Sequence, residues 1–197
     1  MRERANQAEA TRRRIVEATV HLHSTIGLAA ATVTKIAAEA GVTRLTVYRH
    51  FPDVAQLFAA CNAHWSAQQV RPDVAAWLRL ADPGDRICVG LAGLYRFYRG
   101  GEAMLTNVHR DWEVIPDQVR HGVQDGDARL REVLLQPFAA RGERQRRLRA
   151  VIGHAASFTT WRSLCVEQGL SDREAVGAMT ALVLASASST TRHRRTQ

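Results

Sequence analysis

The chain has 197 residues, 46% of them hydrophobic and 23% charged, which is enough for a sizeable core and typical of a soluble globular protein. Three distant cysteines without CxxC spacing argue against a disulfide framework or a zinc site, and no stretch suits a signal segment or a membrane span, so a cytoplasmic protein with no membrane partner is expected. The net charge of +8, carried almost wholly by arginine, favours a polyanionic partner such as nucleic acid, although genome composition alone also raises arginine content.

Apolar residues recur at helical spacing along the whole chain, and no segment alternates as a strand does, so an all-α fold is expected. The first helix is expected to begin at the cap Thr11 and to end at Gly27, after a disordered segment 1–9. Its inner face carries Ile15, Ala18, Leu22 and Ile26.

Two short helices follow on either side of Gly41, with Thr32 and Thr43 as their N-caps. Glycine allows the chain to reverse within about three or four residues, so the two helices form a helix-turn-helix unit. The apolar residues that these helices turn inward are Val33, Ile36, Ala37, Ala40, Val42, Val47 and Phe51. The second helix of such a unit enters the major groove of DNA, which requires an outer face free of core contacts.

The side chains of that outer face suit DNA contacts. Arg44 can donate to guanine, Leu45 can meet a thymine methyl group, and Thr46 can bond to a base or offer its methyl group. Tyr48 and His50 lie to the side and suit phosphates, as do hydroxyls and Lys35 at the start of the preceding helix. The expected DNA-binding residues are Thr32, Thr34, Lys35, Thr43, Arg44, Leu45, Thr46, Tyr48, Arg49 and His50.

Pro52-Asp53 ends this unit and caps a fourth helix, whose apolar stripe is Leu57, Phe58, Cys61 and Trp65. Turn residues then separate further expected helices near 73–80, 85–99, 102–112, 117–123, 127–141, 144–168 and 172–189. The expected domains are a DNA-binding domain at 1–52, a helical body at 53–190 and a disordered basic tail at 191–197.

The first fifty or so residues resemble the DNA-binding domain of the TetR family of transcriptional repressors. The resemblance rests on matched stretches and on the intervals between them: Arg14-Ile15 with Ala18 and Leu22, Gly27, Thr32-Val33, Ile36-Ala37, Ala40-Gly41-Val42-Thr43, Thr46-Val47-Tyr48-Arg49-His50-Phe51, Pro52-Asp53 and Leu57-Phe58. Two residues depart from the family pattern. His23 replaces a buried aromatic residue, which is tolerable if its N–H finds a carbonyl, and Val54 replaces a lysine that supports phosphate binding.

The resemblance implies that the body binds a small-molecule effector, and its many aromatic residues favour a lipophilic or aromatic one. Two sets of residues recur at helical spacing, so each set is expected on one face of a helix. The first set is His154, Phe158, Trp161 and Cys165, and the second is Met104, Val108 and Trp112. Core packing remains the alternative for each residue taken singly. The expected ligand-binding residues are Trp65, Met104, Asn107, Val108, Trp112, Phe138, His154, Phe158, Trp161 and Cys165.

The last two expected helices are rich in small residues, which let helices approach closely. They are Gly153, Ala155 and Ala156 on the first, and Ala175, Gly177, Ala178, Ala181, Ala185 and Ala187 on the second. The resemblance implies that these helices form a four-helix interface in a homodimer, which would then bind a palindromic operator in double-stranded DNA. The alternative is a pair of ordinary core helices.

The resemblance thus implies a repressor that a small-molecule ligand releases from its operator, and two other functions remain as alternatives. The candidates for an enzymatic site are His21-x-His23, His109-Arg110-Asp111 and the pair Cys165 and His154. None of them supplies the full set of residues that a metal site or a catalytic site requires. No phosphate loop, GxSxG or HExxH motif occurs in the sequence. No catalytic residue, metal site or cofactor is therefore expected. A dimeric DNA-binding regulator that needs no ligand is the second alternative, and it predicts a body packed without a cavity.

Overall fold

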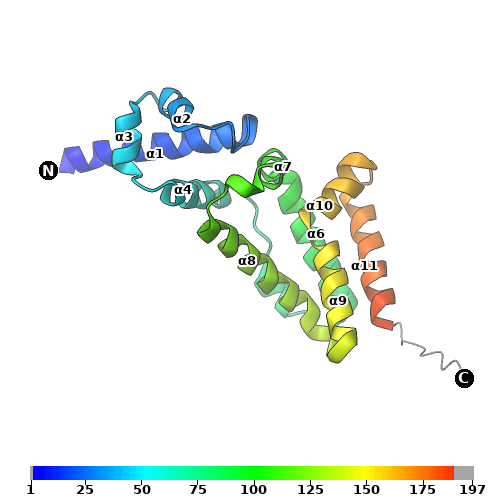
Figure 1. Cartoon of the computed structure of the whole chain (residues 1–197). Coiled ribbons are helices and arrows are strands. Elements are labelled where there is room, and N and C mark those ends of the chain that lie inside the picture. The colour runs from blue at the N-terminus through cyan, green and yellow to red at the C-terminus, as the bar shows by residue number, and fades with distance from the viewer. Residues whose placement is uncertain (1, 189–197) are drawn as a thin grey trace, which may run out of the picture. The chain divides into compact units, whose positions relative to one another are not determined.

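The structure is a computed structural model that describes residues 2–188 (Figure 1). The described part is all-α, as expected, and no strand occurs in it. The first helices are α1 (Arg2–Thr25), α2 (Val33–Glu39), α3 (Arg44–His50), α4 (Val54–Ala67), α5 (Val74–Leu78), α6 (Pro83–Gly100) and α7 (Glu102–Arg110). After them come η1 (Trp112–Val114), α8 (Asp117–Leu135), η2 (Gln136–Phe138), α9 (Gly142–Ala155), α10 (Phe158–Trp161), the π-helix η3 (Arg162–Glu167) and α11 (Asp172–Ser188).

The helices form two compact units. Unit 1 holds the described residues up to 70 together with 100–125, and unit 2 holds 71–99 together with the described residues from 126 onward. The helix-turn-helix therefore shares a unit with α4, α7 and the first half of α8. The expected boundary at 52/53 divides the chain by function and stays a prediction, and the tail 191–197 lies outside the described residues.

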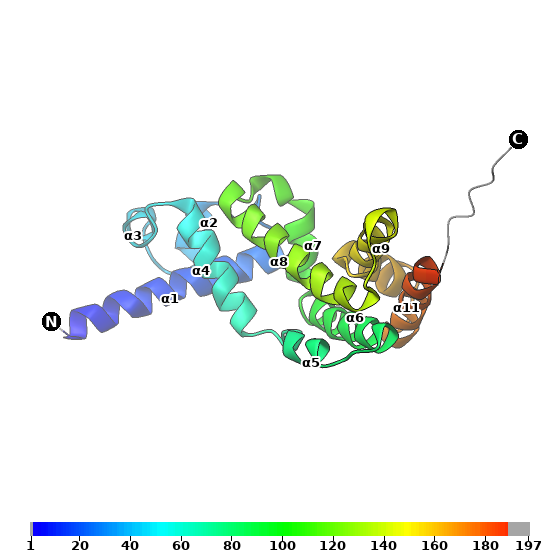
Figure 2. The same cartoon turned by 90° about the horizontal axis from the view of Figure 1, so that it is seen from below.

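The core of unit 1 is built as the periodicity predicts. The buried side chains come from α1 to α4 and include Ile15, Ala18, Leu22, Ile36, Ala37, Ala40, Val47, Phe51 and Leu57. α1 packs against α2, α4 and α7, and α2 packs against α3. Figure 2 shows α2, α3 and α4 beside α1 from a second direction. Burial of these apolar side chains therefore holds the helix-turn-helix against α1.

The first helix differs from the expectation at both ends. It starts at Arg2, so residues 3–9 are helical and not disordered, and the hydroxyl of Thr11 donates to the carbonyl of Gln7 inside the helix instead of capping it. Ile26 was expected on the inner face, but its side chain is 38% exposed. The helix ends at Thr25 and the chain turns at Gly27 (φ +93°), so Ile26 no longer follows the helical period.

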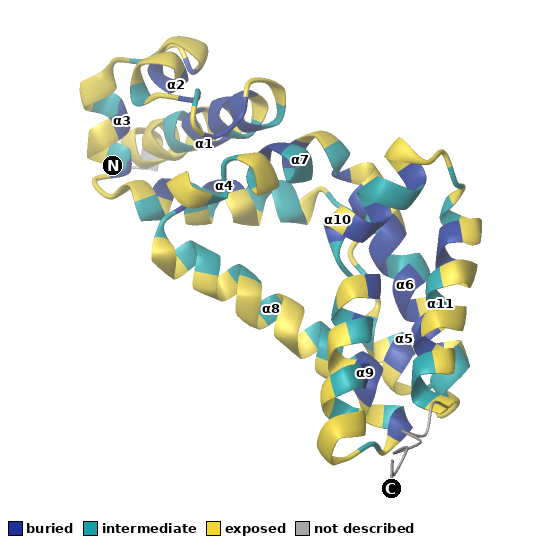
Figure 3. Cartoon of the chain, turned by 45° about the vertical axis from the view of Figure 1, so that its right-hand side comes forward, coloured by how far each residue is buried: buried dark blue, intermediate teal, exposed yellow. Residues whose placement is uncertain are grey.

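Unit 2 has its own apolar core. Its most buried side chains are Trp77, Ile87, Leu91, Tyr95, Leu134, Leu148, Ile152, Trp161 and Val183. α9 packs against α11, and Figure 3 shows that α6 is the most buried of the long helices of this unit. Gly90 in α6 faces Leu134, and a Cβ added there would lie 2.4 Å from a methyl group of the leucine, which would have to shift.

Two expected helix boundaries are wrong. α8 runs without a break through Gly126-Asp127, because Gly126 keeps a helical backbone and glycine ends a helix only where the chain leaves that conformation. The expected helix 144–168 is divided after Ala155: Ser157 accepts the N–H of Thr160 at 3.2 Å and starts α10. Tyr95 and Tyr98 donate their hydroxyls to the carbonyls of Ala155 and Ala156, which satisfies the backbone at this division.

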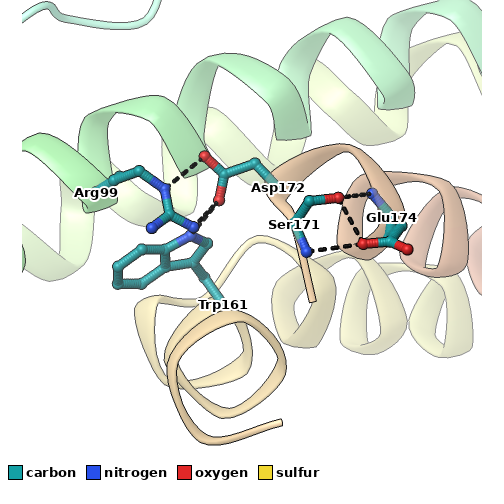
Figure 4. A network of polar contacts seen from close by, with 5 residues as sticks. All are labelled: Arg99, Trp161, Ser171, Asp172 and Glu174. Atoms are coloured by element: carbon teal, nitrogen blue, oxygen red, sulfur yellow. Dashed lines mark hydrogen bonds and ion pairs between the residues drawn. The ribbon is translucent and has the colours of Figure 1, made fainter. Parts of the chain in front are cut away.

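A polar network holds the start of α11 to α6 and α10 (Figure 4). Arg99 donates to both carboxylate oxygens of Asp172 at 2.9 and 2.6 Å, and the indole N–H of Trp161 donates to the same carboxylate at 3.0 Å. The hydrogen bonds from Arg99 lower the pKa of Asp172. Segments of α6, α10 and α11 are therefore joined at one ionised carboxylate.

Within residues 2–188, no helix combines the length and the apolar character that a membrane crossing requires.

Candidate nucleic-acid interface

The turn between α2 and α3 is built from local hydrogen bonds. Thr32 accepts the N–H of Lys35 at 3.4 Å and Thr43 accepts the N–H of Thr46 at 3.1 Å, so both threonines are the N-caps that the sequence predicts. Gly41 adopts φ +64°, and the N–H of Val42 then reaches the carbonyl of Ala37 at 2.9 Å. The left-handed glycine permits the reversal that sets α3 against α2.

α3 has one buried face and one exposed face. Val47 is 1% exposed and fixes the inner face, whereas Leu45 is 76% exposed, far more than a core leucine would be. The exposed outward side chains are Arg44, Leu45, Tyr48 and Arg49, while Thr46 and His50 are half-buried. A cation, a hydroxyl and apolar groups therefore lie together on a short helix whose outer face no other described segment covers, as direct base reading requires.

Besides Thr32, two of the expected contact residues already have side-chain hydrogen bonds within the chain. The hydroxyls of Thr43 and Thr46 lie 2.9 Å apart, and that of Thr43 also serves as the cap acceptor. Thr46 therefore offers its methyl group and its remaining hydrogen-bonding capacity to a base. Lys35 and Thr34 are exposed on α2, where an ammonium group and a hydroxyl remain accessible to a phosphate.

The sequence reasoning missed a contact between α1 and the end of α3. The guanidinium carbon of Arg12 lies 4.6 Å from the centre of the Phe51 ring, a cation–π arrangement that places a positive charge beside the C-cap of α3. The run Arg12-Arg13-Arg14 was a visible signal of basic charge. Its spacing could not show which arginine faces α3, because that depends on how α1 crosses the unit.

A second missed contact joins α7 to the end of α1. Asn107 donates its amide N–H groups to the carbonyls of His23 and Ser24 at 2.8 and 3.0 Å, and it is buried. Asp111 accepts the N–H of Ala29 at 3.1 Å. Asn107, which the sequence places among the ligand-binding residues, thus has both donors engaged by the backbone of α1.

His23 is packed as a neutral side chain. It is 4% exposed, its ring lies 5.1 Å from that of Phe58, and Nδ1 is 3.5 Å from the sulfur of Cys61. Burial lowers the pKa of His23 to about 4, and the negative charge of Asp111 offsets part of that effect. The partner of the imidazole is a thiol, whereas the sequence reasoning expected a carbonyl.

The ten expected ligand-binding residues divide between the two units. Trp65, Met104, Asn107, Val108 and Trp112 belong to unit 1, and Phe138, His154, Phe158, Trp161 and Cys165 belong to unit 2. Phe158 and Trp161 stack with ring centres 5.4 Å apart and are buried. His154 is exposed, because the division after Ala155 separates it from the face that these two residues share. Trp65 packs on Gly101, where an added Cβ would lie 2.7 Å from its ring.

Two open hollows lie beside α4 in unit 1. One, of about 460 Å³, lies between α4 and the first half of α8, with Gln56, Ala59 and Val119 in its wall. The other, of about 620 Å³, lies between α1 and α4, with Arg12, Gln56 and Ala63 in its wall. None of the ten expected ligand-binding residues lines either hollow, so the effector site stays a prediction.

The residues considered for catalysis have other surroundings. His21 lies 3.8 Å from Glu39, and His109 faces the carbonyl of Leu105 at 2.9 Å. Burial raises the pKa of the Cys165 thiol to about 11, which keeps it protonated. Among the described residues, no three His, Cys, Asp or Glu side chains gather as metal ligands would.

Comparison with known proteins bears on the helix-turn-helix and on the fold. Residues 15–61 match the family model described as bacterial regulatory proteins, tetR family. A Clostridium perfringens protein, named as a candidate fatty acid metabolism regulator, has a similar structure with a TM-score of 0.59 at 17% identity, covering 88% of this chain and 97% of its own. A Rhodococcus sp. protein, named as a candidate TetR-family transcriptional regulator, has a TM-score of 0.58 at 16% identity, covering 90% and 99%. No curated protein matches the chain. At these identities the two structures show a shared fold.

Proposed function

We propose that this chain, whose residues 15–61 match the tetR family of bacterial regulatory proteins, is a homodimeric repressor of transcription that a small molecule releases from a palindromic operator. The single observation that carries DNA binding is the outward face of α3, where Arg44, Leu45 and Tyr48 are exposed on a helix whose other face is locked into the core by Val47. A helix presented in this way fits the major groove. Such an activity places the protein with the DNA in the bacterial cytoplasm.

The role of each contact residue follows from the chemistry of its side chain. Arg44 can donate two hydrogen bonds to guanine O6 and N7, and Leu45 and the Thr46 methyl group suit thymine. Lys35 and Thr34 lie on α2, and Tyr48 lies on the side of α3. All three side chains suit phosphate oxygens. Arg12 beside Phe51 adds positive charge at the end of α3 and contributes to the sequence-independent part of binding.

Homodimerisation is supported by the surface of α11. Gly177, Ala178 and Ala181 are exposed on this helix together with Leu182, while Ala175 and Val183 are buried against the rest of unit 2. An exposed stripe of small and apolar side chains allows close approach of a second copy of the helix. A two-fold dimer then presents two α3 helices to two half-sites about one helical turn apart.

Release by an effector is inferred from the likeness to the family. Trp112 and Val108 are only half-buried near the end of α7, so a lipophilic molecule can reach them without displacing a core residue. A compound of this kind should quench tryptophan fluorescence and release the operator over the same concentration range. A regulator that needs no ligand is the alternative, and a screen in which no quenching compound changes operator binding would favour it.

The experiment for DNA binding begins with selection of an operator from random duplexes by the full-length protein. Replacing Arg44 with alanine should cost about 1–3 kcal/mol on the selected site and relax the preference at one base pair. Replacing Lys35 with alanine should weaken selected and random duplexes about equally and reduce the salt dependence of binding by about one unit of slope. The assigned role of Arg44 is wrong if Arg44→Ala weakens selected and random duplexes by the same factor.

A further inference from the structure

The C-terminal end of α7 forms a polar clamp on the end of α1 and on the loop that follows it. The clamp consists of Asn107, Arg110 and Asp111, and all its contacts lie within unit 1. Its partners are 82 to 84 residues away in sequence. Neither the DNA-binding face nor an effector site accounts for these contacts.

Asn107 supplies the first part of the clamp. The last carbonyls of a helix have no partner inside the helix, and Asn107 donates to two of them, those of His23 and Ser24. Asn107 is itself buried, so these carbonyls have no easy replacement by water when the amide is lost. The end of α1 is thereby fixed to the middle of α7.

Arg110 and Asp111 supply the second part. Arg110 donates to Asp111 at 2.8 Å and to the carbonyl of Ile26 at 3.3 Å, and Asp111 accepts the N–H of Ala29. The Asp111 side chain is 8% exposed, and the hydrogen bond from Arg110 lowers the pKa of its carboxyl group to about 2. Gly27 completes the fit, because a side chain at this left-handed position would overlap the guanidinium group of Arg110.

The clamped loop leads directly into the helix-turn-helix. Ala29 is separated from Thr32, the N-cap of α2, by two residues, and α2 and α3 are packed on each other. The orientation of α3 relative to α7 is therefore set at this loop as well as through α4.

We propose that Asn107 and Asp111 are DNA-positioning residues, which fix the direction of α3 through the loop 26–31 and so determine which half-site spacing the dimer accepts. The proposal rests on the proposed function, since spacing has meaning only for a dimer on a two-fold operator. These residues do not touch DNA. Their loss leaves the base-reading face of α3 intact and removes the constraint on where that face points.

The experiment compares full-length variants on a series of duplexes. Asn107→Leu keeps the side-chain size and removes both donors, and Asp111→Asn keeps the shape and removes the charge that holds Arg110. Arg120→Ala is the matched control, because it removes the ion pairs to Glu113 and Asp117 in the same unit without contact to α1. The duplexes carry the selected operator with its centre lengthened or shortened by one and two base pairs, and a single half-site.

Wild-type protein and Arg120→Ala should bind one spacing best and lose affinity steeply on either side. The clamp variants should lose about tenfold on the best spacing, because a loosely oriented second head has a lower effective concentration at its half-site, and should lose much less on the altered spacings. Their affinity for the single half-site should stay within about twofold of wild type, because each α3 still reads its bases. A flattened spacing profile with unchanged half-site binding is the expected result.

Circular dichroism and thermal melting separate this effect from unfolding, which would weaken all duplexes alike. If Asn107→Leu does not fold, Asp111→Asn decides the question, because it removes the charge that holds Arg110 at the carbonyl of Ile26. Clamp variants that keep the wild-type spacing profile overturn the inference. A wild-type protein that selects no operator or shows no spacing preference overturns the proposed function, and with it the basis of this inference.

Discussion

At the scale of single residues, His23 makes the stability of unit 1 depend on pH. In the unfolded chain its pKa is near 6.5, and in the folded protein burial lowers it to about 4. Between these values the unfolded chain binds a proton that the folded protein does not. The contribution of His23 to the free energy of unfolding is therefore fully present above pH 6.5. It falls by about 2–3 kcal/mol as the pH decreases toward 4.

Replacing His23 with phenylalanine should remove that part of the pH dependence while keeping the contact with Phe58. The measurement is chemical denaturation of wild type and variant at pH 7.5 and pH 5. His121→Phe, at an exposed position in α8, serves as the control and should retain the wild-type pH dependence. An equal loss of stability on acidification in wild type and His23→Phe would contradict the assignment.

At the scale of elements, α8 is a long helix that is weakly covered in its first half. Figure 3 shows this segment as exposed and half-buried, with no buried stripe until the helix reaches Leu134 and Leu135. Gly122 and Gly126 lie in it, and a Cβ added to either would meet no atom within 4 Å. Glycine costs conformational entropy there without serving a close approach.

Gly122→Ala and Gly126→Ala should each raise the free energy of unfolding by about 0.5–1 kcal/mol, because alanine narrows the unfolded ensemble and favours the helix. Gly27→Ala should have the opposite effect. Because Gly27 has a positive φ and lies against Arg110, alanine there should lower the free energy of unfolding by at least about 1 kcal/mol. Denaturant titration measures all three. Destabilisation by Gly126→Ala would show that α8 is interrupted at Gly126-Asp127, as the sequence alone suggested.

At the scale of the whole molecule, the proposed dimer makes operator affinity depend on α11. Ala178→Asp and Ala181→Asp place charges on the exposed small-residue face, where a second copy of the helix would bury them at high cost. Both variants should be monomeric at micromolar concentration and should lose about a hundredfold or more in operator affinity, because the two half-sites no longer act together.

Sedimentation and binding to the selected operator check this prediction, with Ala128→Asp on the exposed side of α8 as the control. The control should stay dimeric. Monomeric variants that still bind the full operator as tightly as wild type would show that the two heads act independently. A wild-type protein that is monomeric at micromolar concentration would remove the dimer from the proposal.

The DNA-binding surface could be predicted from sequence because its signals are local. Thr32 and Thr43 cap the helices that begin one residue later, and Gly41 supplies the turn between them. Val47 and Phe51 have a helical spacing that identifies the buried face, and the exposed face follows by exclusion. Each of these signals acts over at most a few residues, so the backbone forms them with little help from the rest of the chain.

The remaining features depend on contacts between distant segments. The amide of Asn107 binds the end of α1 from 84 residues away, and nothing in the neighbouring sequence distinguishes it from an asparagine that faces a ligand. Likewise, α8 continues through Gly126, while the helix after Gly142 is divided where the hydroxyls of Tyr95 and Tyr98 donate to its last carbonyls. The sequence by itself determined the all-α fold and the helix-turn-helix, because short-range periodicity and caps specify them. Only the tertiary structure decided how the helix-turn-helix is held and where the long helices stop, because those outcomes depend on hydrogen-bond partners that folding brings together.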